Sequence, residues 1–165
     1  MLIQAPVTPI LDEATAAFIQ HFVSINVSTA NGHRQPAISR AYGCRVADDL
    51  TRVTLFIYRD RSRQLLQGVH ENHTVAVVFS RPSTLETLQL KGHDATPVEM
   101  TTTDLEYMDR YRESFMRELR LIGFPDTFAT AMMACYGDEM LGIRFTPDAV
   151  FVATPGPRAG KPLSP

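Results

Sequence analysis

The sequence predicts a mainly β fold, one antiparallel barrel or sandwich with a few flanking helices. Alternation is the first reason: Val23, Ile25 and Val27 are separated by the polar Ser24 and Asn26, and a period of two is typical of a half-buried strand. The Asn-Gly pair that follows is a strong hairpin signal. Many such short strands, joined by tight turns, close into a barrel and so remove their exposed edges.

The same patterns set the expected strands along the chain. The stretch 51–58 is rich in the β-branched and aromatic residues that favour strands, and later Leu88 and Leu90 alternate with polar neighbours. The Pro- and Gly-rich end, 152–165, predicts an irregular tail. We expect strands at 23–29, 36–46, 51–58, 74–80, 84–92, 95–100, 140–145 and 149–153.

Helices are expected where apolar residues recur every three or four positions. The longest begins with a capping box at Thr103 and Glu106, and it carries an apolar stripe that includes Tyr111 and Phe115 before Gly123 ends it. The spacings predict helices at about 11–22, within 59–70, over 103–122 and, more weakly marked, over 126–136.

Length and composition indicate one globular domain over 1–165 and exclude several classes of function. Sixteen basic and eighteen acidic residues give a formal charge of -2, which argues against an extended nucleic-acid surface. The apolar runs are too short to cross a membrane, and the N-terminus lacks the basic start of a signal or transit peptide. We therefore expect a cytoplasmic protein that keeps Cys44 and Cys135 as buried, reduced thiols.

The densest group of polar side chains lies where the strand at 51–58 gives way to the short helix. Free N–H groups at a helix N-terminus, a hydroxyl and several guanidinium groups together form a phosphate site. On composition alone, a solvated surface explains the same arginines equally simply. This corner holds, in order, Tyr58, Arg59, Arg61, Ser62, Arg63 and Gln64.

Two further arginines, Arg40 and Arg45, lie in the strand expected at 36–46. They are five positions apart, so a regular strand places them on opposite faces. Both line one pocket only if a bulge intervenes, and Gly43 is the expected position for it. Without a bulge, at most one of the two is a ligand.

No other motif supplies an obvious catalytic group. His70 and His73 have no third ligand nearby in sequence, so a metal site is not expected. The sequence also lacks a nucleophile elbow, a Walker loop and a dinucleotide fingerprint. A pocket without a candidate acid, base or nucleophile is typical of a protein whose cofactor supplies the chemistry.

Several stretches occur together in a characteristic order and spacing. The Arg-Ser-Arg corner at 61–63 is followed by NHTVAVVF, then at a set distance by LQLKG, and near the end by IRFTPDAVFVATPGP. In these pieces the chain resembles the pyridoxamine 5'-phosphate oxidase-like FMN-binding split barrels. The resemblance implies an antiparallel split barrel, FMN as cofactor, and a homodimer whose two flavin sites lie across the interface.

The resemblance also implies roles for individual residues. Arg40 would approach the flavin and its phosphate, and Arg45 would be a second basic phosphate ligand. Ser62 and Arg63 would hold the phosphate at the corner. The isoalloxazine ring would be lined by Phe56, Ile57 and Tyr58, and bonded at its edge by Thr87 or Gln89 of the partner subunit.

The reaction stays open. The Pro- and Gly-rich tail stands where the vitamin B6 oxidases carry an Arg- and His-bearing substrate segment, so that activity is not expected. The leading hypothesis is an FMN-dependent oxidoreductase of unknown substrate and electron donor. The alternatives are a non-catalytic module that stores or senses a flavin or haem, a deazaflavin in place of FMN, and a barrel whose arginines serve only solubility.

Overall fold

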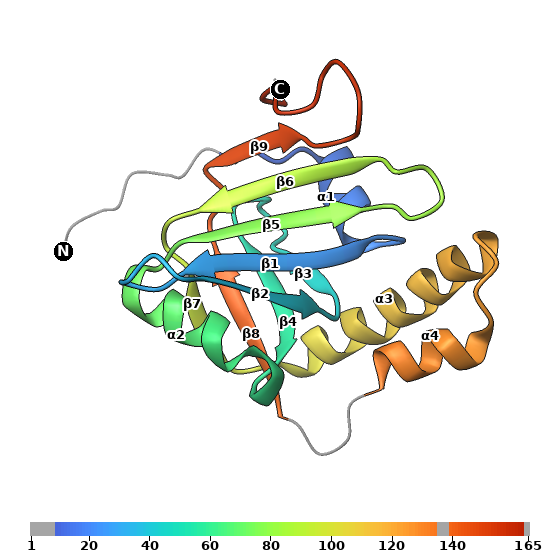
Figure 1. Cartoon of the computed structure of the whole chain (residues 1–165), viewed down its shortest axis with the longest axis horizontal. Coiled ribbons are helices and arrows are strands. Elements are labelled where there is room, and N and C mark those ends of the chain that lie inside the picture. Colours follow the sequence, from blue (N-terminus) through green and yellow to red (C-terminus); the bar gives the residue numbers. More distant parts are fainter. Residues whose placement is uncertain (1–8, 135–138, 164–165) are drawn as a thin grey trace.

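Two antiparallel sheets enclose one apolar core in the computed structural model, which describes residues 9–134 and 139–163 (Figure 1). The five-stranded sheet has the order β2-β1-β5-β6-β9, and the four-stranded sheet has the order β3-β4-β8-β7. The strands are β1 Ser24–Ala30, β2 Pro36–Ala41, β3 Cys44–Val46, β4 Val53–Tyr58, β5 Val75–Ser80, β6 Thr87–Gly92, β7 Thr96–Val98, β8 Met140–Phe145 and β9 Ala149–Val152. The helices are α1 Glu13–Gln20, α2 Arg63–Asn72, α3 Thr102–Leu121 and α4 Asp126–Met133, with a 3₁₀ turn, η1, at Asp60–Ser62.

The single strand expected at 36–46 is wrong, because the chain changes sheets within it. β2 pairs with β1, whereas β3 pairs with β4 in the other sheet. Gly43, between them, has a φ of 129°, a conformation that residues with a side chain rarely adopt. The crossing is fixed to β4, since Tyr42 N–H donates to Phe56 O (2.7 Å) and Phe56 N–H donates to Gly43 O (3.0 Å).

The five-stranded sheet has an apolar inner face and an open outer face. Along β1, buried Ile25 and Val27 alternate with half-exposed neighbours, as the period of two predicts. The register places Arg40, Asn26, Val78, Gln89 and Phe151 in one row across the outer face. β4 is different, because every one of its side chains is buried.

The long helix α3 begins at Thr102, one residue before the expected start, and its N-cap lies two residues before the expected one. Its capping box is formed by Thr101 and Asp104, not by Thr103 and Glu106. A shorter aspartate at the third helical position closes the box as well as a glutamate does: Asp104 Oδ2 accepts from Thr101 N–H (2.9 Å) and Thr101 Oγ1 accepts from Asp104 N–H (3.1 Å). In Figure 1, α3 and α4 run side by side along one end of the barrel.

The remaining elements follow the sequence expectations with small shifts. β6 starts at Thr87 because the residues before it form the turn, where Leu85 has a positive φ. Cys44 is buried and its thiol donates to Ile19 O (3.2 Å), as expected for a core thiol. Cys135 and the expected end of the last helix at Tyr136 lie outside the described residues.

From 153 to 163 the tail forms no helix or strand, as predicted, but it is folded back onto the sheet through an isolated bridge between Phe151 and Pro162. β9 itself extends through Val152. Val152 N–H donates to Lys161 O (2.9 Å) and Leu163 N–H donates to Val150 O (2.8 Å). No helix within 9–134 or 139–163 is both long enough and apolar enough to cross a bilayer.

The crossing between the sheets gives a first prediction. A Cβ atom at position 43 would lie 3.0 Å from Phe56 Cδ2 and 3.2 Å from Tyr111 Cβ, so Gly43→Ala adds a packing clash to an unfavourable φ. We expect the free energy of unfolding to fall by about 2–4 kcal/mol, measured by urea denaturation. Gly123→Ala is the control, because Gly123 has a φ of 89° but no neighbour within 4 Å; it should cost about 1–2 kcal/mol. Equal losses would mean that the close approach to β4 is unimportant.

Candidate functional site

The residues of the predicted phosphate corner form a compact turn between β4 and α2. Tyr58 ends β4, η1 follows, and α2 begins at Arg63. The η1 turn contacts both β2 and β4, so it lies where the two sheets approach each other. The first N–H groups of a helix have no partner within the helix, and the N-terminus of a helix carries the positive end of its dipole.

Ser62 is the most unusual residue of the corner. Its side chain is buried, with 1% of the residue exposed, and its Oγ has no hydrogen-bond partner within the described residues. It occupies the N-cap position of α2 without capping the helix through its side chain. A buried hydroxyl without a partner costs about 1–3 kcal/mol, which makes Ser62 a candidate contact for a bound group.

The arginines of the corner are already engaged. Arg61 Nη1 donates to Tyr42 Oη (3.3 Å) and the guanidinium lies 5.8 Å from the centre of the Tyr58 ring. Arg63, whose side chain is 76% exposed, holds the Asp60 carboxylate through Nε (3.0 Å) and Nη2 (2.5 Å). A phosphate at the corner would therefore compete with Asp60 for Arg63, whereas Arg61 is held by aromatic residues.

Arg40 forms a second polar group, on β2. Its Nη1 donates to Ser24 Oγ (3.5 Å), and its guanidinium lies 4.8 Å from the centre of the Phe115 ring on α3. Its Nε and Nη2 atoms are buried and make no hydrogen bond within the described part of the chain. No carboxylate of the described residues pairs with it in an ion pair, although Arg40 as a whole is half-exposed.

Tyr111 of α3 stands next to Arg40. The ring is fully buried and stacks on Phe115 with 5.8 Å between the ring centres and 4° between the planes. Its hydroxyl also has no hydrogen-bond partner among the described residues. Burial raises the pKa of Tyr111 well above its ordinary value, although the nearby positive charge of Arg40 acts in the opposite direction, so the hydroxyl stays protonated.

The structure does not bring Arg40 and Arg45 together. Arg45 Nε donates to Asp104 Oδ1 (2.6 Å) at the start of α3, whereas Arg40 lies over Phe115, a rise of about 16 Å further along the same helix. The break at Gly43 occurs where a bulge was expected, but it sends the two arginines to different sheets. Arg45 is a partner of the α3 capping box.

Phe56, Ile57 and Tyr58 are buried in β4. The N–H and C=O groups of Phe56 both form hydrogen bonds to the crossing. Tyr58, which belongs to the corner, packs on Tyr42 with 4.5 Å between the ring centres. These side chains form the inner wall behind the corner.

Thr87 and Gln89 lie on β6, three strand positions from Arg40 in the same sheet, or about 14 Å. The Thr87 hydroxyl is already bonded to Ser80 Oγ (2.8 Å) and donates to Leu85 O (2.9 Å). Gln89 is half-exposed on the outer face, in the same row as Arg40. Within one subunit, neither residue contacts the corner or Arg40.

Sequence reasoning missed Tyr42 and Tyr111 as parts of the site. Tyr42 joins Arg61 to Tyr58, and Tyr111 backs Arg40. Tyr111 was assigned to the apolar stripe of the long helix, where its spacing fits. The available signal was its hydroxyl, since a tyrosine in the middle of such a stripe needs a polar partner when buried.

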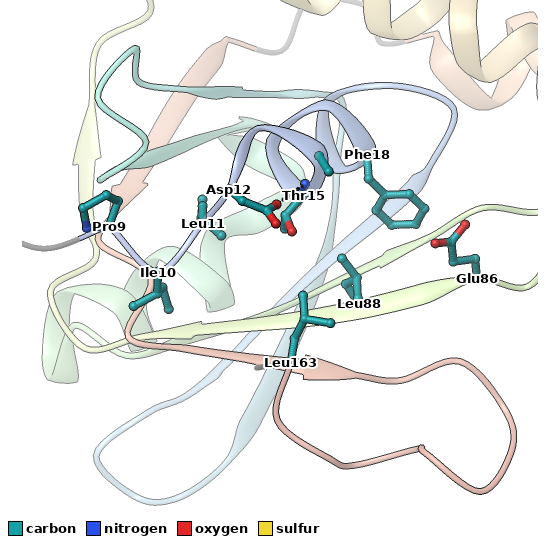
Figure 2. Close-up of a pocket in the computed structure, with 10 residues that line it drawn as sticks. Pro9, Ile10, Leu11, Asp12, Thr15, Phe18, Glu86, Leu88 and Leu163 are labelled. Atoms are coloured by element: carbon teal, nitrogen blue, oxygen red, sulfur yellow. Dashed lines mark hydrogen bonds between the residues drawn. The ribbon is translucent and has the colours of Figure 1, made fainter. Parts of the chain in front are cut away.

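The structure also has a hollow that is separate from this site. The hollow in Figure 2, of about 330 Å³, lies between α1, β6 and the tail, and shows Phe18 and Leu163 on either side of Leu88; it contains none of the predicted site residues. No cluster of three or more His, Cys, Asp or Glu side chains suited to a metal ion occurs in the residues that the structure describes.

The comparisons with known proteins concern the fold. HupZ of Group A Streptococcus superposes with a TM-score of 0.56 over 92% of this chain and 100% of its own, at 16% sequence identity. An F420 reductase gives 0.53 over 85% and 98%, at 16% identity. A Lactobacillus delbrueckii protein described as a proposed pyridoxamine 5'-phosphate oxidase gives 0.51 over 86% and 93%, at 10% identity. No protein-family model and no curated protein matches the sequence.

The architecture and these neighbours define the class of fold. Two antiparallel sheets, a chain that crosses between them, and flanking helices make this chain a split barrel of the pyridoxamine 5'-phosphate oxidase-like type. The fold expected from the resemblance is confirmed.

The ion pair of Arg45 gives a second prediction. Burial raises the pKa of Asp104, but the hydrogen bonds from Arg45 and Thr101 outweigh it and hold the pKa below the ordinary value of 3.8. The carboxylate therefore stabilises the fold above about pH 4, and this contribution is lost as the pH falls through the folded-state pKa. Asp104→Asn should lower the free energy of unfolding at pH 7 by about 1–3 kcal/mol, with a difference that shrinks below pH 4.

Urea denaturation at pH 7 and pH 3 measures this difference. Asp126→Asn is the control, because its ion pair with Arg120 is exposed and should contribute little. A loss for Asp104→Asn that is the same at both pH values would show that the charge of Asp104 is not what matters.

Proposed function

We propose that this chain is a cytoplasmic FMN-binding protein and works as a flavin-dependent oxidoreductase. The observation that carries the proposal is the buried Ser62 hydroxyl, which has no partner within the described residues and stands at the N-terminus of α2. A phosphate oxygen would satisfy this hydroxyl and the first N–H groups of the helix together. Arg61 and Arg63 lie on the flanking turns and supply positive charge.

The remaining polar groups suit the rest of a flavin. Arg40 lies on β2, beside the η1 turn that β2 contacts, and its unpaired nitrogens are donors for ring or phosphate oxygens. Tyr58 and Tyr42 give an aromatic wall next to the corner. When bound, FMN supplies the transfer of electrons and hydride; the side chains of this chain bind it, orient it and keep water from it.

We also propose that the protein is a homodimer through the outer face of the five-stranded sheet. Ile38 is 71% exposed on that face, and Val78 and Phe151 are half-exposed in the row that includes Arg40. Two-fold pairing of this face would bring Gln89 of one subunit towards Arg40 of the other, which the distance within one subunit does not allow. Closed two-fold pairing is the commonest oligomeric arrangement.

A second candidate function is a flavin carrier or sensor without turnover. It is favoured by the described residues around the corner, where the two acids, Asp60 and Glu139, are already paired with Arg63 and Arg59. Haem storage fits less well, because two of the described histidines are bonded away from the corner, His73 to Ala95 O and His93 to Asp148. Mixing the FMN-loaded protein with NADH or NADPH and following flavin bleaching separates an oxidoreductase from a carrier.

The phosphate corner is tested by Ser62→Ala. Purified wild-type protein should be yellow or should take up FMN, with quenching of flavin fluorescence. Ser62→Ala should weaken FMN binding about tenfold without lowering the melting temperature, because the hydroxyl has no partner to lose. Riboflavin, which lacks the phosphate, is the control ligand, and its affinity should be unchanged. Unaltered FMN affinity in Ser62→Ala and in Arg63→Ala would rule out this corner as the phosphate site.

The dimer is tested by Ile38→Glu. A charge on the open face of β2 should convert the dimer to a monomer in size-exclusion chromatography with light scattering, because two carboxylates would be buried opposite apolar residues. FMN affinity should fall with it, since the partner's contribution is lost. Leu121→Glu is the control: Leu121 is 73% exposed at the end of α3, so its variant should remain dimeric. The reverse result would place the interface on the helices.

A further inference from the structure

Three buried polar atoms of β2 and α3 make no hydrogen bond of normal geometry among the described residues, although the Arg40 guanidinium lies close enough to the Tyr111 hydroxyl to interact with it. The three atoms are Nε and Nη2 of Arg40 and the hydroxyl of Tyr111. Buried polar groups are almost always satisfied. Between β2 and α3, several polar atoms that can donate hydrogen bonds therefore lie without an oxygen acceptor of normal geometry among the described residues.

The two nitrogens of Arg40 are not a random pair. Nε and Nη2 form one edge of the guanidinium fork, the edge that binds two oxygens of a planar group side by side. The same edge is used elsewhere in this protein: Arg120 holds the Asp126 carboxylate through Nε (2.5 Å) and Nη2 (2.9 Å). In Arg40 this edge has no such partner within the described chain, while the opposite nitrogen, Nη1, is used by Ser24.

Helix α3 fixes where that edge points. Arg40 lies over the face of Phe115, and Phe115 is stacked on Tyr111 one helical turn earlier. Tyr111 is in turn packed against the crossing, since a Cβ at Gly43 would touch it. The aromatic pair therefore acts as a rigid support for the guanidinium and places the Tyr111 hydroxyl beside it.

We propose that Tyr111 is a ligand-binding residue of the flavin site, and that its hydroxyl and the Nε/Nη2 edge of Arg40 together bind oxygen acceptors of the bound flavin. This inference rests on the proposed function. The acceptors are either the phosphate oxygens or the carbonyl oxygens of the ring, which share the same chemistry toward these donors. Tyr111 thus makes α3, otherwise a packing helix, part of the binding site.

The test is Tyr111→Phe, which removes one oxygen and keeps the aromatic support. A residue with only a structural role would give a stable protein with unchanged affinity, because the hydroxyl makes no hydrogen bond of normal geometry in the described chain. On the proposal, the melting temperature of the flavin-free protein stays the same or rises, while the FMN dissociation constant increases about tenfold. Tyr107→Phe, the same change one turn earlier on α3 where Tyr107 contacts Arg110, should alter neither.

Two further arms complete the experiment. Arg40→Lys keeps the charge but loses the forked edge, and it should weaken FMN binding more than Tyr111→Phe does. Titration with riboflavin identifies the acceptor: a loss for both ligands assigns the ring carbonyls, and a loss for FMN alone assigns the phosphate. FMN affinity unchanged in Tyr111→Phe, or a melting temperature that falls in step with the affinity, overturns the inference. Failure of the wild type to bind any flavin overturns the proposed function and the inference with it.

Discussion

The chain passes from one sheet to the other at Tyr42 and Gly43, and the whole site depends on that crossing. Two backbone hydrogen bonds to Phe56, at 2.7 and 3.0 Å, hold the crossing against the middle of the other sheet. Only a glycine satisfies both requirements at position 43, the positive φ and the close approach of Phe56 and Tyr111. Because of this crossing, Arg40 lies near the end of β2 in one sheet and Arg45 lies in β3 of the other. Tyr42 lies beside the turn between β4 and α2, where its hydroxyl accepts a hydrogen bond from Arg61.

The arginines near the site fall into two groups by their partners. Arg45 and Arg63 each hold a carboxylate, that of Asp104 and that of Asp60, and so contribute to structure as the chain stands. Arg40 has aromatic and hydroxyl neighbours but no described carboxylate. Two of its guanidinium nitrogens are buried and make no hydrogen bond among the described residues, which is unfavourable unless a ligand supplies acceptors. This difference in partners, more than the number of arginines, makes Arg40 a better candidate for binding a ligand than Arg45 or Arg63.

The extent to which the sequence predicts this structure depends on the range of the interactions involved. Alternation and turn signals act over a few residues, and they placed most strands and the turn between β4 and α2 within a few positions. The capping box was misplaced by two residues, because Thr101 with Asp104 and Thr103 with Glu106 both have the required spacing and only the packing of α3 chooses between them. Local patterns also continue smoothly through Tyr42, so the change of sheet was not visible.

The role of Tyr111 could not be predicted for a related reason. Its position in the helical stripe correctly indicates burial, but burial alone does not say what the hydroxyl faces. That depends on Arg40, more than 70 residues earlier in the chain, and on the crossing that brings β2 against α3. Long-range pairings of this kind leave no periodic trace in the sequence.

The unsatisfied atoms follow a consistent distribution. Ser62, Arg40 and Tyr111 account for most of the buried side-chain atoms without a partner in the described chain. They lie on η1, β2 and α3: η1 contacts β2, and Arg40 of β2 lies over Phe115 of α3. A fold selected for stability alone would replace such groups with apolar ones of similar shape, at little or no loss. Their retention where β2, the corner and α3 converge is what a binding site requires, since each leaves a donor available to a ligand. The stability given up at these three positions is therefore expected to return when the acceptor binds.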